Sequence, residues 1–155
     1  MPSYIEARAA IAEIIREVRI TEPDAIEIAH VYETRPDDGA IKLAPSVTIT
    51  GYSMRYQRFP GSTRERRYTI GLRLFVRPAS ASQATMQGIL DALKDAISEE
   101  FDTKVTLGLS GGYSVVEGPN WNSEEPLYEG GGLLEDGEII VLISDTATFD
   151  GGTIG

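Results

Sequence analysis

The 155-residue chain contains no cysteine, one histidine and one tryptophan. Disulfide bonds, thiolate metal ligands and a cysteine nucleophile are therefore excluded. A multi-histidine metal site is excluded too, and a position between Ala29 and Val31 in an expected strand favours a structural role for His30. No apolar run is long enough to cross a bilayer, and the N-terminus lacks the regions of a signal peptide. We expect a protein made in the cytoplasm, without a membrane anchor.

Basic side chains are scarce in the C-terminal part of the chain. Residues 91–155 carry 2 basic and 14 acidic side chains, net −12, whereas residues 1–90 carry 12 and 10, net +2. Half of all basic residues lie in one stretch: Arg55, Arg58, Arg64, Arg66, Arg67, Arg73 and Arg77. Nucleic acid is one possible partner for such a stretch. The acidic pI of about 4.5 opposes phosphate binding, so we expect no sequence-specific nucleic-acid recognition and favour an acidic protein surface instead.

The clearest local pattern is a strand followed directly by a helix, between Arg66 and Phe101. Apolar side chains alternate along the strand, which predicts one buried face. After Pro78, which cannot donate in a ladder, the apolar spacing changes to the threes and fours of an amphipathic helix.

A second helix is predicted over residues 4–18, with Ser3 and Glu6 as a capping box. Its expected core-facing residues are Ile5, Ala9, Ala12 and Ile15.

Residues 46–59 are rich in β-branched and aromatic side chains, and 60–63 form an obvious reversal before the return strand. We therefore predict a long hairpin whose outer part, residues 52–67, projects as an arm, because little could cover its side chains. Aromatic residues and arginine are enriched at interface hot spots, so this arm is the predicted subunit interface. Its candidate residues are Arg55, Tyr56, Arg58, Phe59, Arg64, Arg66 and Arg67.

Turn-forming residues dominate 118–132, which predicts a long glycine-rich loop around Trp121, a further candidate interface residue. Asp136-Gly137 between two apolar pairs predicts a tight hairpin, with the last strand at 138–144. These elements describe one α+β domain over residues 1–155. We expect a mainly antiparallel mixed sheet with two helices packed on one face.

Motifs for chemistry are almost missing. The adjacent carboxylates Asp37-Asp38, Glu99-Glu100 and Glu124-Glu125 are typical of solvated surface. The glycine-rich stretch 108–112 lacks the Lys-Ser/Thr of a phosphate loop, and Ser110 does not stand in a nucleophile elbow. We expect no catalytic residue, metal or cofactor. A small enzyme using His30 or a carboxylate stays as an alternative.

The order of elements is an N-terminal helix, a strand ending in Val31-Tyr32-Glu33, a strand preceded by Pro45, the long hairpin, a helix over 79–97 and a terminal strand ending in Ile139-Ile140-Val141-Leu142-Ile143. Together with the alternation of Tyr68, Ile70, Leu72, Leu74 and Val76 before Arg77, this layout resembles the tail terminator or tail completion proteins of long-tailed bacteriophages. The family contributes no catalytic residues.

The resemblance implies a non-enzymatic structural protein of the virion. Such a protein forms a hexameric ring at the head-proximal end of the tail tube, stops tail polymerisation and provides the surface for head-tail joining. Its expected partners are the tail tube protein and the head-tail connector protein, with the genome passing through the lumen. It assembles in the host cytoplasm.

A ring needs two different patches on one subunit that meet head to tail. We therefore expect the arginines of the arm to contact an acidic surface of the adjacent subunit or the next ring. Besides the small enzyme, two non-enzymatic alternatives remain: a head-tail neck or minor tail protein, and a monomeric adaptor that binds another protein through the arm.

Overall fold

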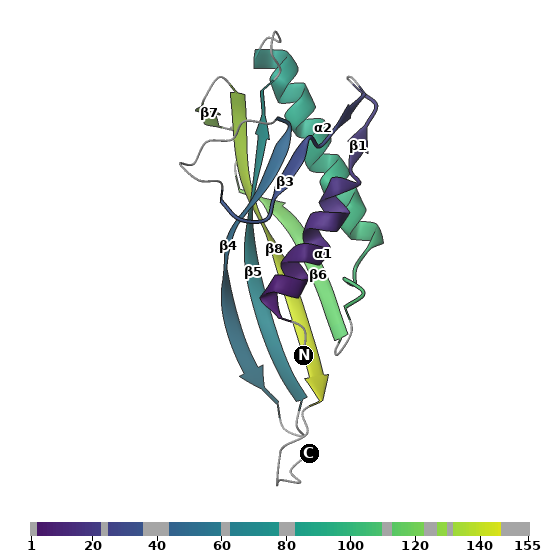
Figure 1. Ribbon diagram of the computed structural model, residues 1–155, viewed down its shortest axis with the longest axis vertical. Coiled ribbons are helices and arrows are strands. Elements are labelled where there is room, and N and C mark those ends of the chain that lie inside the picture. Colours follow the sequence, from purple (N-terminus) through teal and green to yellow (C-terminus); the bar gives the residue numbers. More distant parts are fainter. Residues whose placement is uncertain are drawn as a thin grey trace.

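The computed structural model describes residues 3–22, 25–35, 44–59, 63–77, 83–109, 113–122, 127–129 and 132–146. Two helices, α1 (Tyr4–Arg16) and α2 (Gln83–Thr103), lie on one side of a mixed sheet (Figure 1). The strand order is β3-β4-β5-β8-β6, and β7 pairs with the start of β8. The strands are β3 (His30–Tyr32), β4 (Ser46–Arg58), β5 (Thr63–Val76), β6 (Tyr113–Trp121), β7 (Leu127–Glu129) and β8 (Gly132–Thr146). A separate antiparallel pair joins β1 (Arg19–Ile20) to β2 (Ile26–Glu27).

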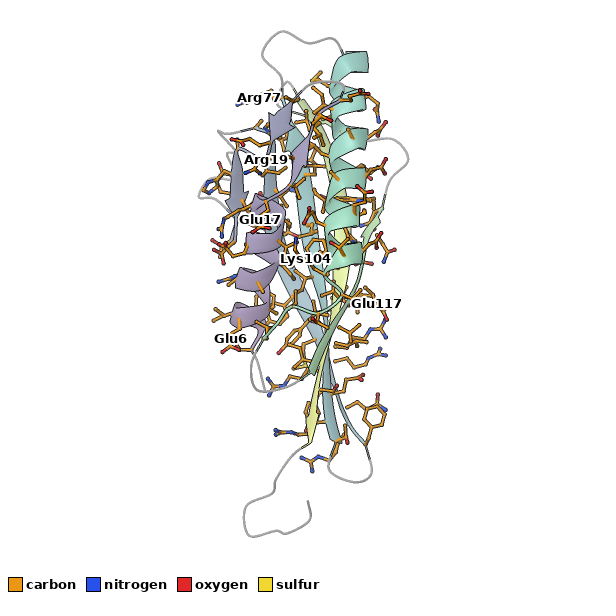
Figure 2. The ribbon with its side chains drawn as sticks, turned by 90° about the vertical axis from the view of Figure 1, so that its right-hand side faces the viewer. Glu6, Glu17, Arg19, Arg77, Lys104 and Glu117 are labelled. Atoms are coloured by element: carbon orange, nitrogen blue, oxygen red, sulfur yellow. The ribbon has the colours of Figure 1, made fainter. Side chains whose placement is uncertain are left out.

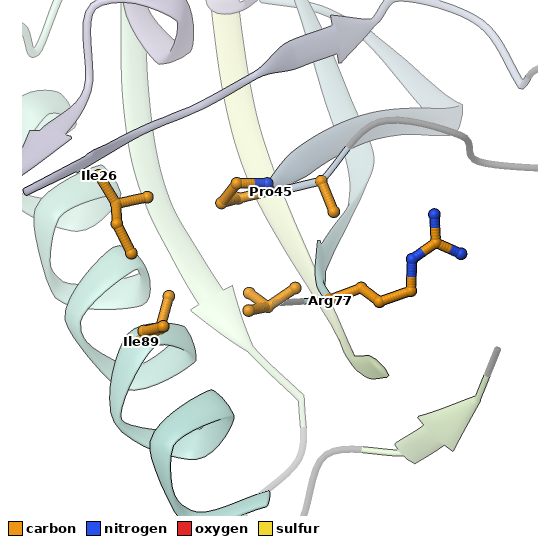
Figure 3. A pocket seen from close by; sticks show the side chains of 6 residues that line it. Ile26, Pro45, Arg77 and Ile89 are labelled. Atoms are coloured by element: carbon orange, nitrogen blue, oxygen red, sulfur yellow. The ribbon is translucent and has the colours of Figure 1, made fainter. Parts of the chain in front are cut away.

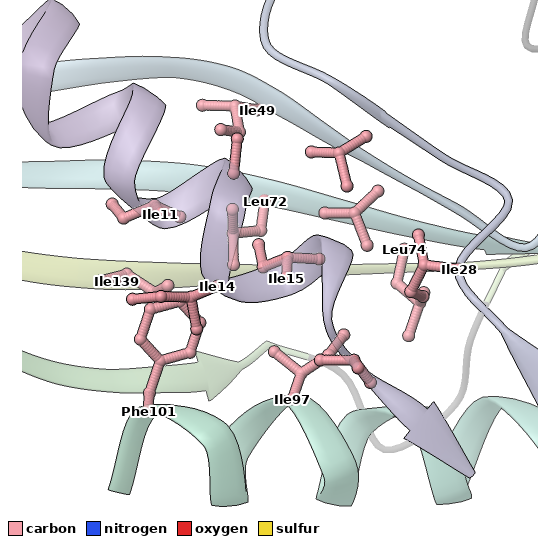
Figure 4. Packing of buried hydrophobic residues seen from close by; sticks show 14 of the residues in the cluster. Ile11, Ile14, Ile15, Ile28, Ile49, Leu72, Leu74, Ile97, Phe101 and Ile139 are labelled. Carbon is pink, nitrogen blue, oxygen red and sulfur yellow. The ribbon is translucent and has the colours of Figure 1, made fainter. Parts of the chain in front are cut away.

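The predicted fold class is confirmed. Only β3 and β4 pair in parallel, and all other neighbours in the main sheet are antiparallel. Both helices contribute to a single core with the same face of the sheet (Figure 4). We call this the helix-side face and the opposite one the back face.

The alternation in β5 and the spacing in α2 form this core as expected. On β5 the buried helix-side residues are Tyr68, Ile70, Leu72, Leu74 and Val76. On α2 they are Met86, Ile89, Leu90, Leu93, Ile97 and Phe101. Each such side chain contributes about 1.5–3 kcal/mol relative to an exposed one, so the strand and helix together account for a large part of the apolar driving force.

Helix α1 begins as predicted but buries a different face. The Ser3 hydroxyl accepts from the Glu6 amide at 3.2 Å, and the Ser3 amide donates to the Glu6 carboxylate at 3.3 Å, which completes the capping box. The expected core positions Ile5 and Ala9 are exposed, Ile5 by 63%, so that prediction was wrong. The Tyr4 ring faces the sheet and stacks on the ring of Tyr52 in β4. Because successive helical residues are about 100° apart, this orientation turns Ile5 outward. The buried residues are Ala7, Ile11, Ala12, Ile14 and Ile15.

Ion pairs attach α1 to its neighbours. Glu33, just after β3, lies 3.2 Å from the Arg16 guanidinium and 3.9 Å from that of Arg8. At the C-terminal end of α1, Lys104 bonds Glu100 and lies 3.6 Å from Glu17, which links the C-terminal ends of the two helices (Figure 2). These contacts fix the helix layer against one side of the sheet.

Asp136-Gly137 is not a turn, so the predicted hairpin is wrong. Strand β8 runs unbroken through both residues, paired with β5 on one side and with β6 and β7 on the other. Asp136 accepts two hydrogen bonds from Arg73, directly across in β5, at 2.8 and 3.2 Å. Long ladders on both sides of a central strand outweigh a two-residue turn preference.

The described residues of the predicted loop 118–132 are mostly strand, which corrects that prediction. Strand β6 continues to Trp121, and β7 occupies 127–129, while 123–126 and 130–131 lie outside the described residues. A bulge between Glu117 and Asn120 shifts the register of β6 by one residue. The shift turns Trp121 to the helix-side face, opposite Gly137.

The free two-stranded arm predicted for residues 52–67 is not confirmed. Strands β4 and β5 do pair out to Arg58 and Arg64. However, β8 pairs with β5 as far as Thr63, and β6 joins at Tyr113. The region is therefore one end of the main sheet, and it extends past the start of α1 (Figure 1). The reversal at 60–62 lies outside the described residues.

Candidate interaction surface

A β-bulge in β4 determines which side chains face which way at this end of the sheet. Ile49 pairs with Leu72 and Gly51 with Gly71, so Thr50 is the extra residue. Gly51 has φ +147°, a conformation that L side chains rarely adopt. Beyond the bulge, Tyr52, Met54 and Tyr56 therefore lie on the helix-side face, and Ser53, Arg55 and Gln57 lie on the back face.

Three tyrosines close the core where α1 begins. The rings of Tyr4 and Tyr52 stack with centroids 3.7 Å apart, and the Tyr68 ring lies 5.7 Å from that of Tyr52. The Arg8 guanidinium lies 5.5 Å from the centroid of the Tyr4 ring. Burial raises the pKa of Tyr4, and the nearby charge of Arg8 lowers it in part. Past this cluster, no described helix covers β4.

The outer β4 surface, residues 51–59, combines an open strand edge with exposed apolar side chains. β3 pairs with β4 only from Ser46 to Thr48, so no other described strand pairs with this edge from Gly51 to Arg58. The opposite edge of the sheet is different, because the Val116 amide of β6 donates to the Val105 carbonyl at 2.8 Å. Among the described residues, four of the six exposed large apolar side chains lie on this surface: Tyr52 (53%), Met54 (48%), Tyr56 (44%) and Phe59 (38%).

The structure divides the predicted arginines between two faces. Arg55 and Arg67 lie directly opposite each other on the back face. Arg66 lies opposite Tyr56, and Arg58 opposite Arg64, on the helix-side face. The strand pairing thus brings all of these residues to one end of the sheet, as expected, but not onto one patch.

Trp121 does not lie with the arginines at this end of the sheet. Its indole Nε1 donates to the Ser98 hydroxyl of α2 at 3.3 Å, and the Lys94 ammonium lies 6.0 Å from its ring centroid. Lys94 also pairs at 3.3 Å with Glu135, whose side chain is fully buried. Trp121 therefore packs against α2, two strands away from β5, and serves the fold.

Sequence reasoning placed Tyr52, Ser53 and Met54 in the projecting arm but did not include them, or Thr69, among the candidate interface residues. Their alternation was visible in the sequence, but Gly51 gave the only local sign of the bulge that decides their faces.

The other residues considered for chemistry stay apart. His30 is exposed, with its ring 4.4 Å from that of Tyr32. Across the described ranges, no group of three or more histidine, aspartate and glutamate side chains could hold a metal ion. Likewise, neither described helix is long and apolar enough to span a membrane. The pairs Asp37-Asp38 and Glu124-Glu125 lie outside the described residues.

An apolar hollow at the opposite end of the sheet is small (Figure 3). Its volume of about 130 Å³ is below the roughly 300–1,000 Å³ of typical ligand pockets. Arg77 supplies the only charged side chain among its lining residues, which are Ile26, Ala44, Pro45, Val76, Arg77 and Ile89. Segments 36–43 and 78–82, which adjoin these residues in sequence, lie outside the described residues, so we do not assign it a ligand.

No protein-family model and no curated protein matches this chain. The outer β4 surface and the arginines beside it are therefore the features on which a function can be argued.

Proposed function

We propose that this protein is a non-enzymatic structural subunit of a phage virion that assembles with copies of itself into a ring at the end of the tail tube. In this role it stops tail polymerisation and offers the surface for head-tail joining. The hexameric state, the tail tube and connector partners, and the location at the head-proximal end of the tail follow from the layout that resembles tail terminator proteins. They belong to the proposal.

The observation that carries the proposal is the outer β4 surface. A strand with an open edge presents unpaired amide and carbonyl groups, which are a template for pairing with another chain. Tyr52, Met54 and Tyr56 on the same strand, with Phe59 just after its end, would add apolar contact area if another chain covered them. In a ring, this end of the sheet would meet a different part of the neighbouring subunit, which is the heterologous geometry that closes a ring.

The first experiment measures self-assembly directly. Light scattering and negative-stain microscopy of the purified protein over a concentration series should show closed rings with a central hole. A particle that stays monomeric at its highest soluble concentration would contradict self-assembly and favour the monomeric adaptor.

A double substitution tests the outer β4 surface itself. Met54→Ser/Tyr56→Ser should weaken assembly without lowering the melting temperature, because both side chains are about half exposed. Val105→Ser is the matched control, since Val105 is 54% exposed and lies outside this surface. Equal effects of the two variants would contradict a specific contact at β4.

A further inference from the structure

We propose that a hollow lined by Ser53, Met54, Arg55, Arg67 and Thr69, whose four polar side chains lie on the back face, is a carboxylate-binding site. Its occupant is the acidic outer face of helix α2 in a second copy of this chain. This inference rests on the proposed function, because it names the surface that receives one end of the sheet in a ring.

The hollow presents hydrogen-bond donors of two kinds. Ser53 lies directly opposite Thr69, and Arg55 directly opposite Arg67, so two hydroxyls and two guanidiniums occupy neighbouring rows of one antiparallel pair. Adjacent strands are about 4.8 Å apart, which lets both guanidiniums reach one anionic group. Arginine binds carboxylates through two parallel N–H···O bonds, so the hollow suits such a group.

Among the described residues, no carboxylate pairs with Arg55 or Arg67. Like charges directly opposite each other destabilise a sheet. A carboxylate bound between them would relieve this repulsion.

Helix α2 carries the complementary surface. Its exposed acidic residues recur at intervals of four, four and three, which places them in one stripe about 16 Å long. They are Asp91, Asp95, Glu99 and Asp102. Like charges four residues apart weaken a helix slightly. Asp91 accepts from Gln87 at 3.1 Å, and in the described residues none of the four is ion-paired.

The two surfaces cannot meet within one molecule. Helix α2 packs on the helix-side face, whereas the hollow opens on the back face, so the sheet separates them. The contact is therefore between copies, with the helix layer of one subunit against the back face of the next. Two different surfaces meeting in this way produce a head-to-tail series that can close into a ring.

Cross-linking tests this contact without depending on the ring. The chain has no cysteine, so Ser53→Cys in one preparation and Asp95→Cys in another provide the only thiols. A short bismaleimide should join the two variants into dimers when they are mixed. The control pair, Ser53→Cys with Ile5→Cys, should give no dimer, because Ile5 is 63% exposed but lies on α1, outside the acidic stripe of α2.

Charge reversal tests the energetics. Arg55→Glu/Arg67→Glu and Asp95→Arg/Glu99→Arg should each weaken self-association roughly a hundredfold or more. Mixing the two variants should restore assembly, since each reversed surface then faces its complement. Arg19→Glu/Arg77→Glu makes the same change in net charge at the opposite end of the molecule and should leave assembly intact (Figure 2).

The outcomes separate this inference from the proposed function. Rings that survive Arg55→Glu/Arg67→Glu, with no specific cross-link, would overturn the inference and leave the ring proposal standing. Cross-links and rescue by mixing without any ring would support the inference and contradict the ring. Unchanged assembly combined with lost retention on a DNA column would assign the arginines to phosphate instead and overturn the inference.

Discussion

At the scale of single residues, Gly51 decides the chemistry of each face at one end of the sheet. The extra residue Thr50 shifts the alternation by one position, so tyrosines follow Val47 and Ile49 on the helix-side face. Without the bulge, Ser53 and Arg55 would point toward the helices. The donor-lined hollow exists on the back face because of this one conformation.

Gly51→Ala should therefore destabilise the protein by about 1–3 kcal/mol. No atom lies within 4 Å of the added methyl position, so the cost arises from the backbone conformation at φ +147° and not from a clash. Urea unfolding measures it, with Ser53→Ala on the same strand as the control, expected within about 0.5 kcal/mol. Equal stability of the two variants would show that the bulge does not require glycine.

Tyr4 gives the molecule a pH dependence in the alkaline range. Burial raises the pKa of Tyr4 above the value of 10.0 in an unfolded chain. The unfolded chain therefore loses this proton first as the pH rises. The contribution to stability is full below pH 10 and is lost as the pH rises through the raised pKa.

Tyr4→Phe should remove the contribution of Tyr4 ionisation to the pH dependence of stability. The free energy of unfolding should then fall less steeply above about pH 10, by up to roughly 1.4 kcal/mol per pH unit. Denaturant titrations at several alkaline pH values measure the slope, and Tyr56→Phe is the control because Tyr56 lies on the exposed surface of β4. Parallel slopes for wild type and Tyr4→Phe would contradict the assignment.

At the scale of elements, β8 organises the sheet. It pairs along its length with β5 and accepts β6 and β7 on its other edge, so it is central although its sequence contains a turn signal. Gly137 has a packing role within this strand. A Cβ at Gly137 would lie 2.6 Å from Cε3 of Trp121, so the indole ring needs glycine opposite it.

Gly137→Ala should displace the indole and cost about 1–3 kcal/mol, as overpacking in a core does. Because Trp121 is the only tryptophan, its fluorescence should shift to longer wavelength as the ring leaves Ser98 and becomes more exposed. Glu138→Ala, one residue along on the back face, should change neither quantity. An unshifted spectrum in Gly137→Ala would contradict the close packing.

At the scale of the whole molecule, the arginine pair and the acidic stripe lie on opposite sides of the subunit. The arginine pair opens on the back face, and the acidic stripe of α2 lies on the far side of the helix layer. Copies related head to tail would bring opposite charges together, while copies related back to back would oppose arginine with arginine.

Self-association should therefore weaken as salt rises from 0.1 M to 1 M, over which the screening length falls from about 10 Å to about 3 Å. Sedimentation velocity at several NaCl concentrations measures this dependence. The Arg55→Glu/Arg67→Glu variant should lack it, because its remaining contacts are apolar. Association that strengthens with salt in the wild type would show that the apolar residues of β4 dominate.

The sequence by itself determined the features that depend on near neighbours: the Ser3 and Glu6 capping box, the alternation in β5, the amphipathic face of α2 and the α+β class. It also located the arginines at one end of a hairpin. Tertiary structure decided the rest, because each remaining feature depends on a partner distant in the chain. Arg73 bonds Asp136 across 63 residues and holds the turn signal in a strand. Pairing of β8 with the outer part of β5 made the predicted arm part of the sheet, and the bulge at Thr50 divided the arginines between two faces.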